Sequence, residues 1–337
     1  MKKRKRIYIL LLIGIFLIGI LFWGYKTIFE TYCGEDKWIM VDANEGKDAL
    51  HDSLEMKLGD EFGDKVYNLW SILGGDISQS EGAYKVEKGM TIWHITKSIL
   101  RNHQTPIRVV FNNVRTFEQF SKRISGCLNF SELELLQVCD TILPNNGFNK
   151  ANYVSVFLPD SYEFYWTVSA EAFVKKMLKY YNSFWDDNRK KKADAMGLTP
   201  KQISIIASIV EEETNKRDER PVVARLYMNR LKKNMKLQAD PTVKFAIGDF
   251  TLRRITHSHL QIESPYNTYK YEGLPPGPIR MADKLTLDAV LNAPNHKYIY
   301  MCAKEDFSGY HNFAVDFDTH KENARRYQQE LNRRNIK

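Results

Sequence analysis

Three consecutive glutamates end an apolar segment of this sequence, and they are the residues best suited to acid–base chemistry. Residues 203–214 read ISIIASIVEEET, which places Glu211, Glu212 and Glu213 at the end of the apolar run. A carboxyl group beside apolar surface resists ionisation, so its pKa rises. Such a group can act as the general acid that protonates the leaving oxygen of a glycosidic bond.

Glu211 is the member of the three that we predict to be catalytic. On a helix it continues the apolar stripe of Ile203 and Ala207, which precede it by eight and four residues. Asn215, one turn further on, offers no cation to hold its charge. Raising its pKa from about 4.3 to about 6 leaves about a tenth of the molecules protonated at pH 7, at a cost of about 2.3 kcal/mol.

Glu212 and Glu213 are expected to lie in more ordinary surroundings. Each has a basic residue four positions later, Lys216 and Arg217 respectively, and this spacing predicts two exposed ion pairs. The residues alone leave a second interpretation open, in which all three glutamates form a solvated helix end.

The helix that carries these glutamates has a well-marked start. Thr199 is a suitable N-cap, Pro200 fits the first helical position, and Gln202 stands three residues after the cap, as in a capping box. A further helix is predicted to begin at Arg220-Pro221.

Loops rich in Asn, Thr, Tyr, Gln and Gly follow at residues 237–242, 264–269 and 273–279. Neutral hydrogen-bonding side chains mixed with aromatic rings favour an uncharged ligand with many hydroxyl and amide groups. The sequence contains no glycine motif of the kind that binds phosphate.

The N-terminus predicts a membrane anchor. A basic cluster at residues 2–6 precedes residues 7–29, in which Lys26 is the one charged residue. About 20 apolar residues span a bilayer core, whereas the apolar region of a cleaved signal peptide has about 7–15. The positive-inside rule then places the basic cluster in the cytoplasm and the chain after the anchor on the other side.

Most of the excess positive charge belongs to this anchor. The 337 residues have a formal net charge of +8, and residues 1–29 hold six basic and no acidic residues, so the remainder carries +2. A nucleic-acid-binding protein needs a basic stripe on its folded part, so we predict no nucleic-acid partner.

The cysteine spacing predicts no metal site, and the sequence indicates no organic cofactor. None of the four cysteines belongs to a C-x-x-C pair. Cys127 and Cys139 are the one close pair, and the spacing leaves open whether they form a disulfide or remain free thiols.

The segments between the anchor and the glutamates predict two α+β modules. Strands at 38–41, 82–86 and 107–111 alternate with helices at 46–73 and 91–100, which makes a small module. Residues 116–150 are mostly helical. A second module begins near Tyr153 with an aromatic loop at 157–166 and a long helix at 170–190.

The sequence resembles the YceG-like family, the endolytic murein transglycosylases of bacteria. The matching segments are ASIVEEET (207–214), ERPVVA (219–224), NRL (229–231), LQADPTV (237–243), YNTY (266–269) and GLPPGPI (273–279). The segments FLPD (157–160) and HNF (311–313) also match. Glu212 and Ala239 depart from the family pattern, which often has Lys and Thr there, and neither change removes a catalytic group.

The resemblance implies an α+β fold with a definite layout: a cytoplasmic tail (1–6), a transmembrane helix (7–29), a LysM-like module (30–115), a helical connector (116–152) and a catalytic domain (153–337). It implies a single-pass protein of the cell (inner) membrane, with its catalytic domain on the periplasmic or extracytoplasmic side.

The resemblance also implies an activity. A lytic transglycosylase of this kind cleaves the β-1,4 bond between N-acetylmuramic acid and N-acetylglucosamine inside peptidoglycan glycan strands and leaves a 1,6-anhydro end. Its role would be to end the elongation of nascent strands, with penicillin-binding proteins or other cell-wall synthases as partners. The alternatives are a non-catalytic peptidoglycan-binding scaffold for such synthases and a hydrolase that uses water.

The predicted site follows from the same segments. Glu211 matches the catalytic glutamate as we place it in the family motif. The predicted substrate-binding residues are Glu213, Thr214, Asn229, Gln238, Asp240, Thr242, Tyr266, Asn267, Thr268 and Tyr269. For the loop residues among them, hydrogen bonds that merely fix the loop are an equally open interpretation.

Overall fold

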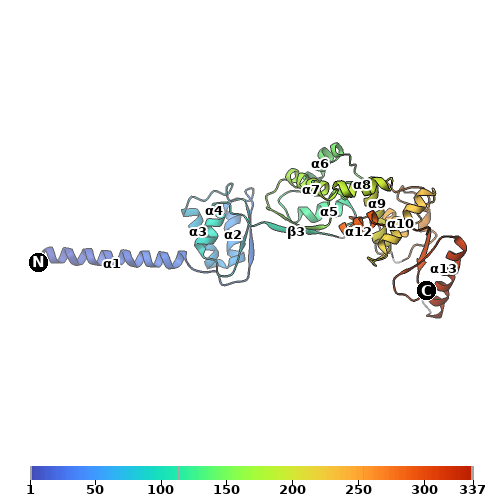
Figure 1. Cartoon of the computed structure of the whole chain (residues 1–337). Helices are drawn as coiled ribbons and strands as arrows, with labels where there is room; N and C mark the ends of the chain where they lie inside the picture. Colours follow the sequence, from blue (N-terminus) through green and yellow to red (C-terminus); the bar gives the residue numbers. More distant parts are fainter. Residues whose placement is uncertain (1, 113, 253, 335–337) are drawn as a thin grey trace. The chain divides into compact units, whose positions relative to one another are not determined.

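The computed structural model describes residues 2–112, 114–252 and 254–334, and its architecture is mixed α+β, as predicted (Figure 1). The chain forms two compact units. The first contains Met1–Val109, Cys127–Asn129 and Tyr162–Val168, and the second contains Val110–Gly126, Phe130–Ser161 and Ser169–Lys337.

The first unit has a small core between one β-ribbon and three helices. Its elements are α1 (Lys2–Ile28), β1 (Lys37–Val41), α2 (Gly46–Leu58), α3 (Asp60–Ile72), β2 (Gly82–Val86) and α4 (Ile92–Leu100). Strands β1 and β2 pair antiparallel, with Ile39 opposite Tyr84. Both side chains are buried with Leu54, Trp70 and Ile99, and the indole N–H of Trp70 donates to Ser80 at 3.0 Å.

A glycine divides the helix that the sequence predicts at 46–73. Gly59 adopts a φ of +93° between α2 and α3, a conformation that favours glycine over residues with a Cβ. The chain turns there, so the apolar residues of both helices reach one core, and the prediction of a single helix is wrong at this point.

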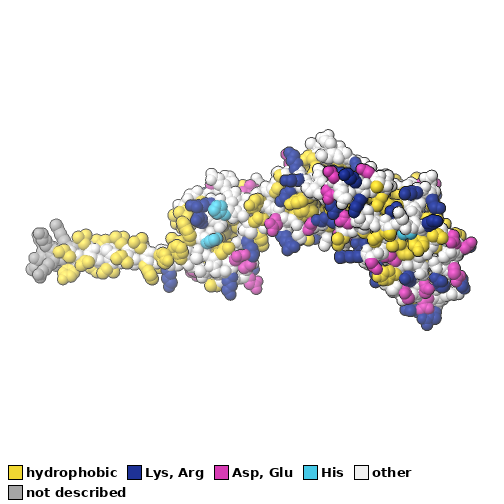
Figure 2. All heavy atoms as spheres, in the orientation of Figure 1, with side chains coloured by type: hydrophobic (Ala, Val, Ile, Leu, Met, Phe, Trp, Pro, Cys, Tyr) yellow, Lys and Arg dark blue, Asp and Glu magenta, His cyan; other side chains and the backbone are white. Residues whose placement is uncertain are grey.

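Helix α1 is long and apolar enough to cross a membrane. Residues Ile7–Ile28 have a mean hydropathy of 2.7, and hydrophobic side chains cover this segment in Figure 2. These properties match the predicted anchor.

Strands β3 (Ile107–Phe111) and β4 (Asp160–Phe164) pair in a second two-stranded sheet. The sequence predicts β3, but it predicts a loop where β4 lies. Tyr162 and Phe164 alternate with exposed residues along β4 and are buried, so the aromatic residues of this segment serve the core.

The second unit is mainly helical before its C-terminal hairpin. The elements before α9 are α5 (Phe117–Ser125), α6 (Glu132–Ile142), α7 (Ala170–Phe184) and α8 (Asp187–Ala195), with 3-10 turns at Pro144–Asn146 and Tyr153–Val156. Those from α9 onward are α9 (Pro200–Glu213), α10 (Arg220–Lys232), α11 (Asp240–Ile247), a 3-10 turn (His259–Gln261), α12 (Lys284–Leu291), β5 (Tyr300–Ala303), β6 (His311–Ala314) and α13 (Phe317–Arg333).

Helix α9 lies at the centre of this unit. It packs against α8, α10, α11 and α12, and Ile203, Ile206, Ala207, Ile209 and Val210 are fully buried. Burial of so many apolar side chains fixes the position of the helix, and with it the three glutamates at its end.

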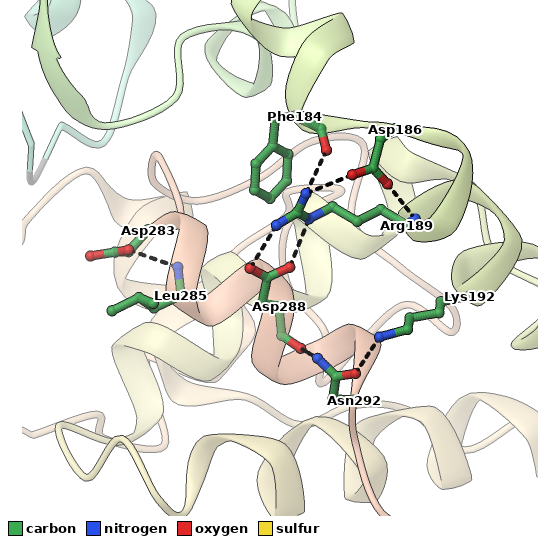
Figure 3. Close-up of polar contacts among 8 residues, drawn as sticks. All are labelled: Phe184, Asp186, Arg189, Lys192, Asp283, Leu285, Asp288 and Asn292. Atoms are coloured by element: carbon green, nitrogen blue, oxygen red, sulfur yellow. Dashed lines mark hydrogen bonds and ion pairs between the residues drawn. The ribbon is translucent and has the colours of Figure 1, made fainter.

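An ion pair connects α8 and α12, two of the helices that pack on α9 (Figure 3). The guanidinium group of Arg189 on α8 donates from Nε and Nη2 to the two carboxylate oxygens of Asp288 on α12, at 2.8 and 3.0 Å. It also lies over the ring of Phe184, 4.2 Å from the centroid. The predicted long helix at 170–190 is in fact α7 followed by α8, because Asp186 caps a new helix with a hydrogen bond from the Arg189 amide.

The last elements form a β-hairpin covered by a helix. Strands β5 and β6 pair antiparallel, with Cys302 opposite Asn312, and α13 packs on both. All four cysteines are free thiols, so Cys127 and Cys139 form no disulfide in this structure.

Candidate active site

The start of α9 confirms the capping box that the sequence predicts. The Thr199 hydroxyl accepts a hydrogen bond from the Gln202 amide, and the Gln202 side chain accepts one from the Thr199 amide at 2.8 Å. Pro200 occupies the first turn. The helix continues to Glu213 and ends at Thr214, whose backbone is extended with a φ of −139°.

Glu211 is held by an arginine that lies far along the sequence. Its Oε1 lies 3.2 Å from Nη2 of Arg280, and its Oε2 accepts a hydrogen bond of 2.8 Å from the amide of Asp283. The side chain is 10% exposed. The sequence predicts no cation within one helical turn of Glu211, and the cation that the structure places beside it comes instead from a distant part of the chain.

Glu212 shares the same arginine. It accepts a hydrogen bond of 2.7 Å from Nη1 of Arg280, and Arg115 donates to both of its oxygens at 3.0 and 3.1 Å. The predicted pair with Lys216 does not form. Two glutamates and two arginines thus make a compact charged cluster on this side of the helix end.

Glu213 lies in a different environment from its two neighbours. Its Oε1 accepts a hydrogen bond of 2.6 Å from the hydroxyl of Tyr227 on α10, and the predicted pair with Arg217 does not form. Burial raises the pKa of Glu213 to about 7, even though the Tyr227 hydrogen bond favours the charged form. The nearby carboxylate of Asp240 raises the pKa further.

A polar cleft of about 380 Å³ opens beside Glu213, which is within the size range of small-ligand sites. It lies between α10, the start of α11 and the β5–β6 hairpin. Its polar lining residues are Glu213, Tyr227, Arg230, Gln238, Asp240, Tyr269, Tyr300, His311 and His320. The hydroxyl of Tyr269 donates to Asp240 at 2.6 Å, so this carboxylate has a fixed orientation.

Arg230 fixes one wall of the cleft. It donates to the carbonyl oxygens of Lys236 and Ile299 at 2.9 and 3.0 Å, and to the side-chain oxygen of Gln238. Gln238 has a φ of +52°, a strained conformation for a residue with a side chain. The contacts of Arg230 hold it there.

A second hydrogen-bond network, centred on Glu219, stabilises the end of α9. The buried Glu219 accepts hydrogen bonds from the Thr214 hydroxyl at 3.0 Å and from the amide of His311 at 2.8 Å, and it contacts Nδ1 of His311 at 2.7 Å. Burial opposes ionisation of Glu219, but these hydrogen bonds outweigh it and hold its pKa below the ordinary value. The network positions His311 at the cleft.

The structure brings four predicted residues into the cleft: Glu213, Gln238, Asp240 and Tyr269. Five of the others satisfy their polar groups within the protein. Asn229 binds the carbonyls of His296 and Tyr298, and Asn267 binds those of Leu260 and Ile262. Thr242 and Thr268 bond each other, Thr214 bonds Glu219, and Tyr266 packs on Phe245. For this second group the loop-fixing interpretation fits the contacts better.

Tyr227, Arg230 and Tyr300 line the cleft, although the sequence does not single them out as site residues. Tyr227 and Arg230 lie three residues apart on the predicted helix, a spacing that puts them on one face. That spacing could have indicated two site residues on one helix face, but many buried helix faces have the same spacing.

A second cavity, of about 270 Å³, lies on the Glu211 side. Its lining residues are Asn112, Pro159, Glu211, Asn215, Arg217, Arg220, Arg280, Met281 and Asp283. Glu211 therefore faces a cavity dominated by arginines, whereas Glu213 faces the larger cleft.

Among the described residues, one group of side chains could share a metal ion. The side-chain ligand atoms of His51, Glu55 and Asp64 in the first unit lie within 4.8 Å of one another. The ring of His51 already contacts Asp64 at 3.1 Å and stacks on Tyr67. These contacts account for the cluster without an ion.

Fold and site together define the class: an α+β protein with a carboxyl group poised near neutral pH in a polar cleft. Within this class the chain belongs to the YceG-like family, because the model of that family matches residues 48–326.

Two bacterial proteins are similar to part of this chain. An endolytic murein transglycosylase of Bacillus subtilis is 38% identical over 138 residues, which cover 41% of this chain and 38% of that protein. An endolytic murein transglycosylase of Streptococcus pneumoniae is 33% identical over 128 residues, 37% of this chain and 21% of that protein. The chain thus matches less than half the length of these relatives.

A solved structure extends the similarity over most of the chain. The crystal structure of a putative YceG-like protein from Listeria monocytogenes superposes with a TM-score of 0.58 at 25% identity. The match covers 86% of this chain and 98% of that one.

Proposed function

We propose that this protein is a membrane-anchored lytic transglycosylase that cleaves peptidoglycan glycan strands internally. The observation that carries the proposal is the carboxyl group of Glu213, which lines a polar cleft and has a pKa of about 7. At pH 7 about half of such groups are protonated, which suits a general acid. The names of the two relatives support the same activity.

The proposed reaction uses one carboxyl group twice. Neutral Glu213 protonates the oxygen that links N-acetylmuramic acid to N-acetylglucosamine, and the bond from that oxygen to C1 breaks. The carboxylate formed then accepts the proton of the C6 hydroxyl, whose oxygen bonds to C1. The product has a 1,6-anhydro end, the acid is regenerated, and no water is consumed.

Glu213 replaces Glu211 in this proposal. Glu211 accepts from Arg280 and from a backbone amide, so both of its oxygens already have donors within the protein. Glu213 accepts one hydroxyl hydrogen bond, and burial disfavours its charged form. Asp240, on the same cleft, is suited to stabilise the positive charge that develops at C1.

We further propose the layout that the sequence predicts. Helix α1 anchors the chain, residues 1–6 lie in the cytoplasm, and the remainder lies outside it. Residues 30–115 form a LysM-like module, 116–152 a connector, and 153–337 the catalytic domain. The hydropathy of α1 and the separate core of the first unit support this arrangement. Cell fractionation with protease protection tests it, since digestion only from the outer side supports the topology.

The cellular role that we propose is to end the elongation of nascent strands beside penicillin-binding proteins or other synthases. Anchoring next to the site of synthesis is the reason for this assignment. Crosslinking of the full-length protein in cells tests it, and the absence of any synthase among the crosslinked partners would contradict it.

Product analysis tests the activity itself. Full-length protein in detergent is incubated with purified peptidoglycan, and the products are identified by mass spectrometry. Release of 1,6-anhydro muropeptides from within strands is expected. Reducing ends would identify a hydrolase, and binding without products would identify the scaffold of the alternative hypothesis.

A further inference from the structure

The cavity on the Glu211 side has the composition of an anion-binding site. Three guanidinium groups, those of Arg217, Arg220 and Arg280, line it against two carboxylates, Glu211 and Asp283. Neither the transglycosylase reaction nor the Glu213 cleft uses this cavity.

Two of these arginines lack a carboxylate partner. Among the described residues, the exposed Arg217 and the half-buried Arg220 form no ion pair, whereas Arg115 and Arg189 of the same unit each contact a carboxylate. Arg220 donates from Nη1 to the hydroxyl of Thr286 at 2.6 Å, and its buried Nε has no hydrogen-bond acceptor. Arg220 thus carries a guanidinium charge that no carboxylate side chain of the described residues balances, in a residue that lines the cavity.

The third arginine is rigidly positioned. Arg280 is 12% exposed and is held by Glu211 through Nη2 and by Glu212 through Nη1. Glu211 therefore acts as a support for Arg280, and its second oxygen, which binds the Asp283 amide, anchors it to the start of α12.

The cavity also lies at the start of α10, whose N-cap residue, Glu219, bears a carboxylate. Arg220 is the first residue of α10, a helix of 13 residues whose N-cap makes no side-chain hydrogen bond to the first turn. The N-terminal end of a helix carries a partial positive charge and attracts anions. Arg217 lies just before it, so charge and helix end coincide at the cavity.

We propose that this cavity binds an oxyanion, a carboxylate or phosphate group, through Arg217 and Arg220. Guanidinium groups bind such oxyanions in bidentate geometry. Two ligands could supply such an oxyanion. One is a carboxylate of a peptide attached to the glycan, and this assignment rests on the proposed function. The other is a phosphate-containing ligand, and that assignment is independent of the proposed function.

The test measures binding to the full-length protein in detergent by isothermal titration calorimetry. The probes are inorganic phosphate, pyrophosphate, and a muropeptide with either free or amidated stem carboxylates. Saturable binding of at least one anionic probe is expected. Preference for the free over the amidated muropeptide identifies a peptide carboxylate, and preference for the phosphates identifies the other source.

Matched variants locate the binding. Arg217→Gln and Arg220→Gln should each weaken the affinity about ten-fold or more, while Arg101→Gln, which removes an exposed arginine of the first unit, should leave it unchanged. Arg217 is exposed, so its variant folds even if the Arg220 variant does not.

The proposal is overturned if no probe binds saturably, or if Arg217→Gln binds as the wild type does. Cleavage of glycan strands is measured separately on the same preparations. A protein that binds anions but does not cleave contradicts the proposed function and leaves the anion site standing, so the two failures are distinguishable.

Discussion

Tyr227 and Glu213 are joined by a hydrogen bond of 2.6 Å from the tyrosine hydroxyl to Oε1 of the glutamate. Burial raises the pKa of Tyr227 well above its ordinary value, so its hydroxyl remains a donor at every physiological pH. Burial also raises the pKa of Glu213 to about 7. The cleft thus pairs a permanent donor with a carboxyl group that changes its charge near neutrality.

Glu213→Gln should abolish most of the cleavage. Glutamine keeps the shape of the side chain but has no acidic proton, so the rate of anhydro-muropeptide release should fall by ~10²–10⁴-fold. Release is measured by mass spectrometry on full-length protein, with circular dichroism to check folding.

Glu211→Gln is the matched comparison, two residues earlier on the same helix. It weakens the support of Arg280 but leaves the Glu213 cleft in place, so a smaller loss than for Glu213→Gln is expected. A larger loss for Glu211→Gln would indicate that Glu211 is the general acid, as the sequence predicts.

The difference between these two glutamates could not be predicted from local sequence. The capping box of Thr199 and Gln202 was predictable, because both partners lie within one helical turn. The partners of the glutamates are distant: Arg115 is 97 residues from Glu212, Arg280 is 68, and Tyr227 is 14 from Glu213. Spacing at i+4 predicts ion pairs only where no tertiary partner competes.

Two helix boundaries were missed for a similar reason. The apolar periodicity continues across Gly59, so the pattern predicts one helix there, and the helix predicted at 170–190 runs past the end of α7 into the polar residues of α8. The backbone turns at Gly59 because the two helices pack on the same core, and Asp186 starts a new helix whose Arg189 binds Asp288. Burial patterns specify which faces are apolar, but not where the chain reverses.

Tyr227→Phe should move the pH dependence of cleavage upward. The Tyr227 hydrogen bond favours ionised Glu213, so its removal raises the pKa of that carboxyl group. The reaction requires the protonated form, so kcat/KM should fall at a higher pH than in the wild type. Profiles of kcat/KM between pH 5 and 9 measure the shift.

Tyr300→Phe is the control for that profile. Tyr300 also lines the cleft, but its ring stacks on His320 and its hydroxyl is not a partner of Glu213. An equal displacement of both profiles would mean that the shift does not report on the hydrogen bond.

Gly63→Ala should destabilise the first unit selectively. A Cβ at Gly63 would lie 2.5 Å from the backbone of Leu54, so α2 and α3 would have to separate. Overpacking of this kind costs about 1–3 kcal/mol. Hydrogen exchange should be faster throughout α2–α4 and unchanged in α9. Gly126→Ala, where the nearest atom lies at 3.5 Å, is the control, and equal exchange in the two variants would contradict the packing argument.

Glu213 should make the protein less stable as the pH rises. Its pKa is higher in the folded protein, about 7, than the ordinary value of about 4.5, so the folded state binds the proton more tightly. The stabilisation is complete below about pH 4.5 and is lost as the pH rises to about 7. Glu213→Gln removes this dependence and should be more stable than the wild type at pH 8, by up to about 3 kcal/mol, but not at pH 4.5. Urea midpoints at the two pH values measure the difference.

Glu330→Gln provides the opposite case, because Arg333 and Arg334 lower the pKa of Glu330 to about 2 and its carboxylate favours folding at high pH. Stabilisation of both variants at pH 8 would show that the gain at position 213 is a general effect of removing negative charge.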